Sequence, residues 1–217
     1  LVLVGAAALI IHRAPLLAGG KGIDSWSSKE SSFLINNLLF IALTVGVFMG
    51  TIMPSLSEWL RGQKITVGAE FFDRFSTPIG LAIFLLTGVC ALLAWGKSDL
   101  KRLLKNAALP AGVTAAMLAA LLLLGVRGAA ALTALAILLF SLTTTLVEFI
   151  RGARVRARTD QLSFPRALLS LALHNKRRYG GAIVHLGVLL LFLGITGSSA
   201  FSVDKTATLN KGDVIEL

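Results

Sequence analysis

Long runs of apolar residues dominate this sequence and restrict the folds that it can adopt. A helix rises 1.5 Å per residue, so about 20 apolar residues cross the hydrocarbon core of a bilayer. Five runs reach roughly this length, at 33–53, 77–95, 107–126, 129–150 and 182–201. A mean hydropathy of +0.81 and a hydrophobic content of 55% are atypical of water-soluble domains. We therefore predict an all-α polytopic membrane protein with five full transmembrane helices.

The two ends of the sequence differ from these five runs. Residues 1–11 are apolar but too short to span, which predicts one partial helix. Residues 202–217 alternate polar and apolar side chains around Asn210 and Gly212, as in a strand, a turn and a second strand. We predict a transmembrane domain over 1–201 and the start of a small periplasmic β domain over 202–217. Because Leu1 is not methionine, we expect a piece of a longer protein.

Positive charges are unevenly distributed among the predicted connections, which indicates the orientation of the helices. The connections 13–31, 97–106 and 151–178 contain fifteen of the 21 Lys and Arg residues and share one side if the spans alternate. The positive-inside rule assigns this side to the cytoplasm. The C-terminal tail and an amphipathic loop predicted over 54–75 are then periplasmic. We expect a multi-pass protein of a bacterial inner (cytoplasmic) membrane.

Charge and cysteine content exclude several classes of function. The net charge of +10 follows the topology, so we expect contact with the lipid bilayer and no binding of nucleic acid. The single cysteine, Cys90, excludes an internal disulfide and a Cys-X-X-Cys site. There is no glycine-rich phosphate loop, no His-Glu-X-X-His and no series of intramembrane carboxylates for proton transfer.

One histidine, His185, interrupts the last apolar run. An ionisable side chain in a spanning helix is costly and is a candidate for function. Burial favours the neutral imidazole, which is the form that binds metals. Gly181 lies one turn before His185 and Phe192 two turns after it, on the same side of the helix. This face suits a flat apolar macrocycle with His185 as the metal ligand, but it equally suits a histidine hydrogen-bonded to a neighbouring helix.

The last apolar run also contains a stripe of small residues, and basic and aromatic residues precede it. A second stripe consists of Gly180, Gly187, Gly194 and Ser198. Small residues let helices approach closely in lipid, so we expect this stripe to pack against another helix. Arg177, Arg178 and Tyr179 precede the run and are expected to anchor it at the lipid surface.

Several motifs together resemble one known family. The most specific are RRYGGAIVHLGV at 177–188 and LGITGS at 193–198. SKE at 28–30, LINNLL at 34–39, GTIMP at 50–54 and VGAEFFD at 67–73 occur in the same order as in that family. The sequence thus resembles the CcmF family, the cytochrome c haem lyases of bacterial cytochrome c biogenesis.

The resemblance implies a haem b held between two histidines of different helices, the second of which corresponds to His185. It implies that haem, also the substrate, comes from the chaperone CcmE and is joined through thioether bonds to apocytochrome c, with thiol-reducing and presenting subunits as partners. The tryptophan-rich motif and the other family histidines have no counterpart here. The chain therefore resembles the C-terminal half of a holocytochrome c synthase, inactive alone. The alternative is a non-catalytic membrane scaffold or transporter half in which His185 is structural.

Overall fold

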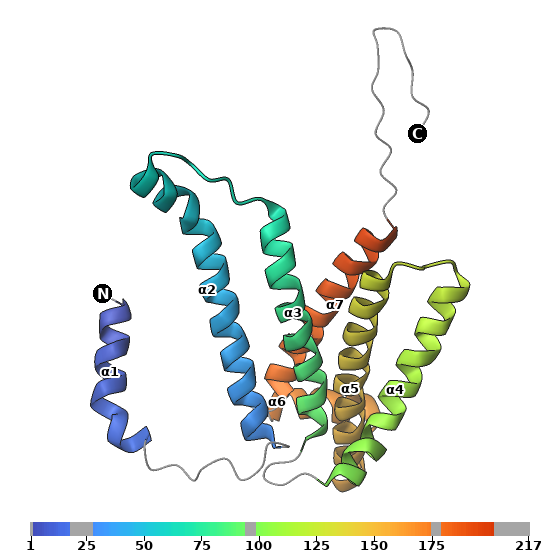
Figure 1. Ribbon diagram of the computed structural model, residues 1–217. Helices are drawn as coiled ribbons and strands as arrows, with labels where there is room; N and C mark the ends of the chain where they lie inside the picture. Colours follow the sequence, from blue (N-terminus) through green and yellow to red (C-terminus); the bar gives the residue numbers. More distant parts are fainter. Residues whose placement is uncertain (1, 18–27, 94–98, 175–178, 202–217) are drawn as a thin grey trace. The chain divides into compact units, whose positions relative to one another are not determined.

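Every element of regular secondary structure in the described part of the chain is a helix (Figure 1). The computed structural model describes residues 2–17, 28–93, 99–174 and 179–201. The helices are α1 (Val2–Leu17), α2 (Lys29–Arg61), α3 (Ala69–Leu92), α4 (Leu100–Leu123), α5 (Ala129–Thr159), α6 (Phe164–His174) and α7 (Gly181–Phe201). In these ranges five helices, α2, α3, α4, α5 and α7, are long and apolar enough to cross a membrane. The predicted all-α fold is confirmed for the described residues, and its five long apolar helices are consistent with the predicted polytopic membrane protein. The predicted β segment 202–217 lies outside the described residues.

Several helices extend well beyond the apolar runs that predicted them. α2 continues past Pro54 to Arg61, and α5 continues past Ile150 to Thr159. Arginine and alanine, which are good helix formers, dominate this extension of α5. The expected loops 54–75 and 151–178 are therefore largely helical, which corrects their boundaries. Within 54–75 only residues 62–68 are not helical.

The connection between α2 and α3 folds back on the last turn of α2. Gly62 adopts φ 64°, which suits glycine, and donates its N–H to the Glu58 carbonyl (2.9 Å). The Ser57 hydroxyl donates to the Pro54 carbonyl (2.8 Å) and accepts the N–H of Ile65 (3.0 Å). These bonds satisfy polar groups at the helix end and hold a short connection in place of the long loop expected from the sequence.

The chain divides into two compact units, and each is described by itself. The first comprises residues 1–79 and 92–105, and the second comprises residues 80–91 and 106–217. In the first unit, α2 packs through two glycines against the first part of α3. Gly46 faces the ring of Phe75, and Gly50 faces the rings of Phe71 and Phe72. Glycine on α2 thus makes room for aromatic side chains of α3.

The second unit is organised around α5. The buried residues of this helix are Leu135, Leu138, Leu139, Ser141, Thr144, Thr145, Phe149 and Ala153. Ser141 donates to the carbonyl of Phe84 on α3 (2.6 Å), and Gly88 lies directly beside Ser141. Thr144 and Thr145 donate to carbonyls of their own helix, so these buried hydroxyls are satisfied.

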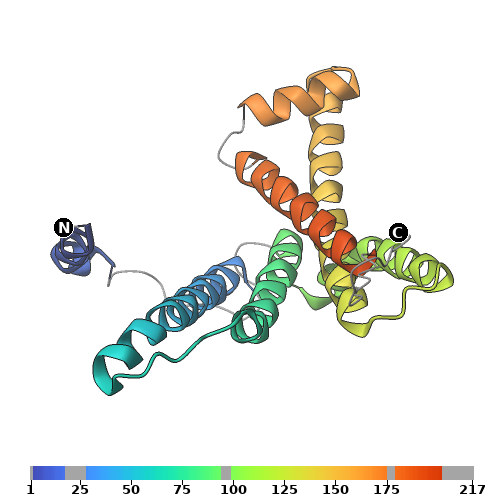
Figure 2. The same cartoon turned by 90° about the horizontal axis from the view of Figure 1, so that it is seen from above.

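A small apolar cluster joins α5, α6 and the start of α7. Phe149, Ala153, Leu171 and Tyr179 form this cluster. Tyr179 is only 5% exposed, and its ring centroid lies 5.3 Å from that of Phe149. Gly152 provides space for the Tyr179 hydroxyl. The expectation that Tyr179 anchors the helix at the lipid surface is therefore wrong, because a pocket between helices buries its ring. Figure 2 shows α6 running from the end of α5 toward the start of α7.

Candidate functional site

The predicted ligand lies on a side of α7 that is not packed against the rest of its unit. Ala182 and Leu186 pack against the cluster at the end of α5, and Leu189 is only 1% exposed. These three residues form one stripe at helical spacing. His185 is exposed, and a Cβ atom added at Gly181 would meet nothing within 4 Å. His185 and Gly181 thus share an open face beside the packed stripe.

An aromatic pair borders this face two turns further along α7. Phe192 is 40% exposed, and its ring centroid lies 4.7 Å from that of Phe84, with the planes inclined by 59°. His185 lies seven residues earlier, which is about 10.5 Å along the helix axis. Sequence reasoning identified Phe192 but missed Phe84. A phenylalanine within an apolar run carries no signal of its tertiary partner.

The glycine stripe of α7 does not pack as the sequence predicted. An added Cβ atom at Gly180, Gly187 or Gly194 would meet nothing within 4 Å. Leu186 packs instead against the cluster at the end of α5, and Leu189 is almost fully buried. These side chains fill the space between the helices, so the glycine stripe stays open in the described part of the molecule. The expectation of glycine-mediated packing is wrong for this unit.

Other potential metal ligands do not gather around His185 in the described structure. Within the described ranges there is no group of three or more His, Cys, Asp and Glu side chains that could hold a metal ion. His12 is exposed on α1, and His174 is exposed on α6 with its Nδ1 atom 3.1 Å from the Ser170 carbonyl oxygen. His185 therefore offers one ligand on an apolar face, which is chemistry suited to axial ligation rather than to a multidentate metal site.

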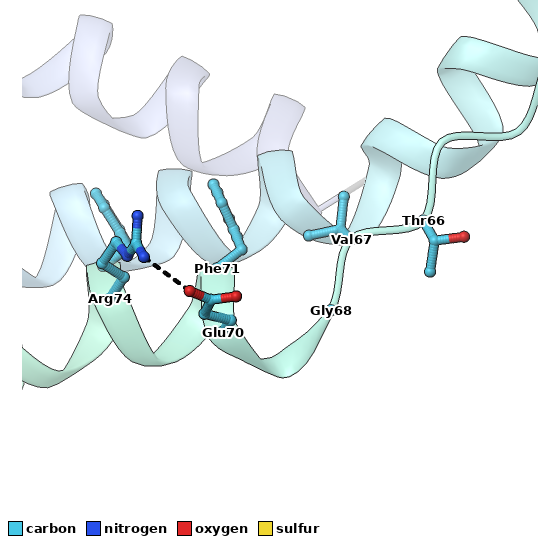
Figure 3. Close-up of a pocket in the computed structure, with 7 residues that line it drawn as sticks. Thr66, Val67, Gly68, Glu70, Phe71 and Arg74 are labelled. Atoms are coloured by element: carbon cyan, nitrogen blue, oxygen red, sulfur yellow. Dashed lines mark hydrogen bonds and ion pairs between the residues drawn. The ribbon is translucent and has the colours of Figure 1, made fainter.

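A second candidate surface lies at the start of α3 in the other unit (Figure 3). It is a recess of about 600 Å³ lined by Thr66, Val67, Gly68, Glu70, Phe71, Arg74 and Phe75. The rings of Phe71 and Phe75 are stacked, with centroids 6.4 Å apart. Glu70 and Arg74 form an ion pair (2.7 Å) between largely exposed side chains. The recess therefore combines an aromatic wall with a solvated polar rim.

The fold and the isolated histidine define a multi-pass membrane protein with a single candidate ligand on an open helix face. Along its whole length the chain is similar to cytochrome c-type biogenesis proteins. It is 28% identical to CycK of Bradyrhizobium diazoefficiens over 215 residues (97% of this chain) and 27% identical to CcmF of Pseudomonas aeruginosa over 222 residues (100%). It is 31% identical to ccl1 of Rhodobacter capsulatus over 216 residues (98%).

The chain covers only part of each of these relatives. It spans 31%, 32% and 31% of their respective lengths. The predicted resemblance is confirmed in that the chain is similar to about a third of the length of proteins named CcmF or CycK. No family model matches the chain, and no solved structure matches it.

Proposed function

We propose that this protein takes part in cytochrome c maturation as part of a membrane haem lyase that binds haem b through His185. The observation that carries the proposal is His185 itself, a histidine on an apolar helix, exposed beside an open glycine position. The names of the relatives support the pathway, since all three are cytochrome c-type biogenesis proteins. The bacterial inner membrane and a periplasmic tail belong to the same proposal.

The residues around His185 fit a haem. A flat macrocycle held by His185 would need space on the helix surface beside this ligand, and bulky neighbours would take up that space. Gly181 leaves that surface free, and the pair Phe192–Phe84 offers an apolar edge further along the helix. A bound haem b would supply one-electron redox chemistry. His185 would hold the iron, Gly181 would admit the ring, and Phe192 would pack against its apolar edge.

A second histidine ligand and the attachment chemistry would come from other parts of the complex. We expect the second histidine in a portion of the full-length protein outside this chain, because the relatives are about three times as long. In the proposed reaction, each cysteine thiol of apocytochrome c adds across a haem vinyl group. The S–H bond and the π bond of the vinyl group break while a carbon–sulfur bond and a carbon–hydrogen bond form, so the thiols must arrive reduced. The chaperone CcmE as haem donor and thiol-reducing subunits are the proposed partners.

The test is a visible spectrum of the full-length protein that contains this segment, oxidised and dithionite-reduced. Wild type, His185→Ala and His174→Ala would be compared in detergent at matched protein amounts. We expect a low-spin b-type spectrum that His185→Ala abolishes and that His174→Ala, which changes an exposed histidine of α6, leaves intact. A spectrum that survives in His185→Ala would leave this histidine structural and favour the scaffold alternative.

A second variant tests the shape of the site independently of ligation. Gly181→Leu adds a side chain at the open position while keeping His185 and the apolar character of the helix. We expect normal membrane insertion and a monodisperse elution profile, but a reduced haem content. Normal haem content in Gly181→Leu would show that the ring does not lie over this position.

A further inference from the structure

The short helix α6 exposes a broad apolar side. Its residues Ala167 and Leu171 are 0% and 4% exposed, and Leu171 packs in the cluster with Phe149 and Ala153 of α5. By contrast, Leu169 and Leu173 are 63% and 55% exposed. Phe164 and Leu168 are also exposed. With 11 residues, α6 is about 16.5 Å long, too short to cross a bilayer. A short helix with this exposed apolar side is suited to lie in the membrane interface.

Arginine residues are concentrated in the segment that contains this apolar side. The segment 151–174 contains five arginines and a single acidic residue, Asp160. Arg156 engages that aspartate (Nε–Oδ2 3.2 Å) and also donates to the Ser170 hydroxyl (3.0 Å). Asp160 is thus already paired. Three further arginines of the segment, Arg154, Arg158 and Arg166, are exposed.

The turn between α5 and α6 brings these charges next to the exposed leucines. The N–H of Leu162 bonds to the Ala157 carbonyl (3.0 Å), and Gln161 takes φ 50°, so the chain reverses directly after α5. The bond from Arg156 to Ser170 then ties α6 to α5. Arg158 lies just before this turn and Arg166 in the first turn of α6. Positive charge and apolar surface are therefore parts of one local structure.

We propose that this region, the α6 surface, binds anionic phospholipid. The α6 surface consists of Phe164, Leu168, Leu169 and Leu173 with Arg154, Arg158 and Arg166. The apolar side chains enter the boundary of the acyl chains, and the guanidinium groups bind lipid phosphates, for which their planar donor geometry is suited. Anionic lipid fits better than another protein segment because exposed apolar and basic groups occur together, and the single acidic side chain of the segment, Asp160, is paired with Arg156. The proposal does not depend on haem binding.

The first experiment measures where α6 lies. A nitroxide at Leu169→Cys, in the full-length protein lacking other cysteines, is compared with one at Thr159→Cys in vesicles of phosphatidylcholine and phosphatidylglycerol. We expect the label at 169 to collide mainly with oxygen and the label at the exposed end of α5 mainly with a water-soluble nickel reagent. Nickel-dominated collisions at 169 would place α6 in water. Protection from both reagents would place it under another protein segment, and either result overturns the proposal.

The second experiment measures the charge preference. Native mass spectrometry counts phosphatidylglycerol and phosphatidylcholine retained by wild type and by R154Q/R158Q/R166Q. A matched variant, R61Q/K64Q/R74Q, removes the same charge near the connection of α2 and α3. Since each basic residue near an anionic surface contributes appreciably, we expect about a tenfold or greater loss of phosphatidylglycerol in the first variant only. Equal losses in both variants, or none, would refute a specific lipid site.

Discussion

The two units use glycine for helix packing in different ways. In the first unit, Gly46 of α2 lies against an aromatic side chain, the ring of Phe75. In the second unit, Gly88 of α3 lies against the backbone of α5: an added Cβ atom would be 2.9 Å from the Cα atom of Ser141. Ser141 also donates to the Phe84 carbonyl on the same side of the crossing (2.6 Å). One glycine makes room for a ring, and the other lets two helices approach closely.

This difference should determine how well each helix crossing tolerates a larger side chain in place of its glycine. A ring can rotate or shift when a neighbour grows, whereas two helix backbones can only move apart. The burial of the helices follows the same order, since α5 has eight buried residues and α2 has four. The crossing of α3 and α5 at Gly88 should therefore be more sensitive to a larger side chain than the crossing of α2 and α3 at Gly46, although both positions are glycine.

The largest effect is expected from Gly88→Leu. The new side chain would meet Ser141 and separate α3 from α5, and overpacking of this kind typically costs 1–3 kcal/mol. The variant should also lose the hydrogen bond from Ser141 to Phe84. Thermal unfolding in detergent, followed by loss of the monodisperse elution peak, measures the change against wild type.

The matched control is Gly80→Leu on the same helix. An added Cβ atom at Gly80 would meet nothing within 4 Å. Gly80→Leu therefore raises helix propensity and apolarity as Gly88→Leu does, but it creates no steric contact with another helix. Its unfolding temperature should stay near that of wild type or rise slightly. If both variants unfold at the same temperature, the close approach at Gly88 does not limit stability.

A smaller loss is expected from Gly46→Ala. The added methyl group overlaps the ring of Phe75, but this ring belongs to a flexible side chain that can move at a cost of about 1 kcal/mol. The double variant Gly46→Ala/Phe75→Leu should recover part of the loss, and a double-mutant cycle of unfolding temperatures measures the coupling. Additive effects of the two substitutions would show that the methyl group and the ring do not compete for space.

The membrane fold was predictable because each span leaves a signal in its own sequence. The limits of the helices were not, since Pro54 and Pro110 lie inside helices that neighbouring structure and lipid permit to continue. Helix α6 was missed within a predicted loop, although Ser163 and Pro165 mark its start: the Ser163 carbonyl accepts the N–H of Ala167 (2.9 Å). A stronger weight on these start signals would have found it.

For the candidate site, the histidine was predictable from the sequence but its surroundings were not. His185 is conspicuous because a lone ionisable side chain in an apolar run is unusual. Its surroundings depend on which side of α7 meets α5, and the sequence offered two competing stripes of similar periodicity. The glycine stripe satisfied a rule for close packing, but Ala182 and Leu186 pack against the neighbouring cluster instead. Relative helix rotation depends on side chains from several helices at once, which a single helix does not encode.

The smallest expected effect comes from a position whose backbone favours glycine although the residue is not glycine. Gln161 follows the end of α5 with φ 50°, a left-handed conformation that costs most residues about 1 kcal/mol. Gln161→Gly removes this cost but increases the freedom of the unfolded chain, so a net stabilisation of about 0.5 kcal/mol is expected. Gln161→Ala is the control, because it removes the side chain and keeps the unfavourable backbone. Equal unfolding temperatures for Gly and Ala would show that the turn stores no backbone strain. A higher unfolding temperature for Gln161→Gly alone would show that the backbone conformation favours glycine at this position. At Gly46 and Gly88, by contrast, the neighbouring atoms favour glycine.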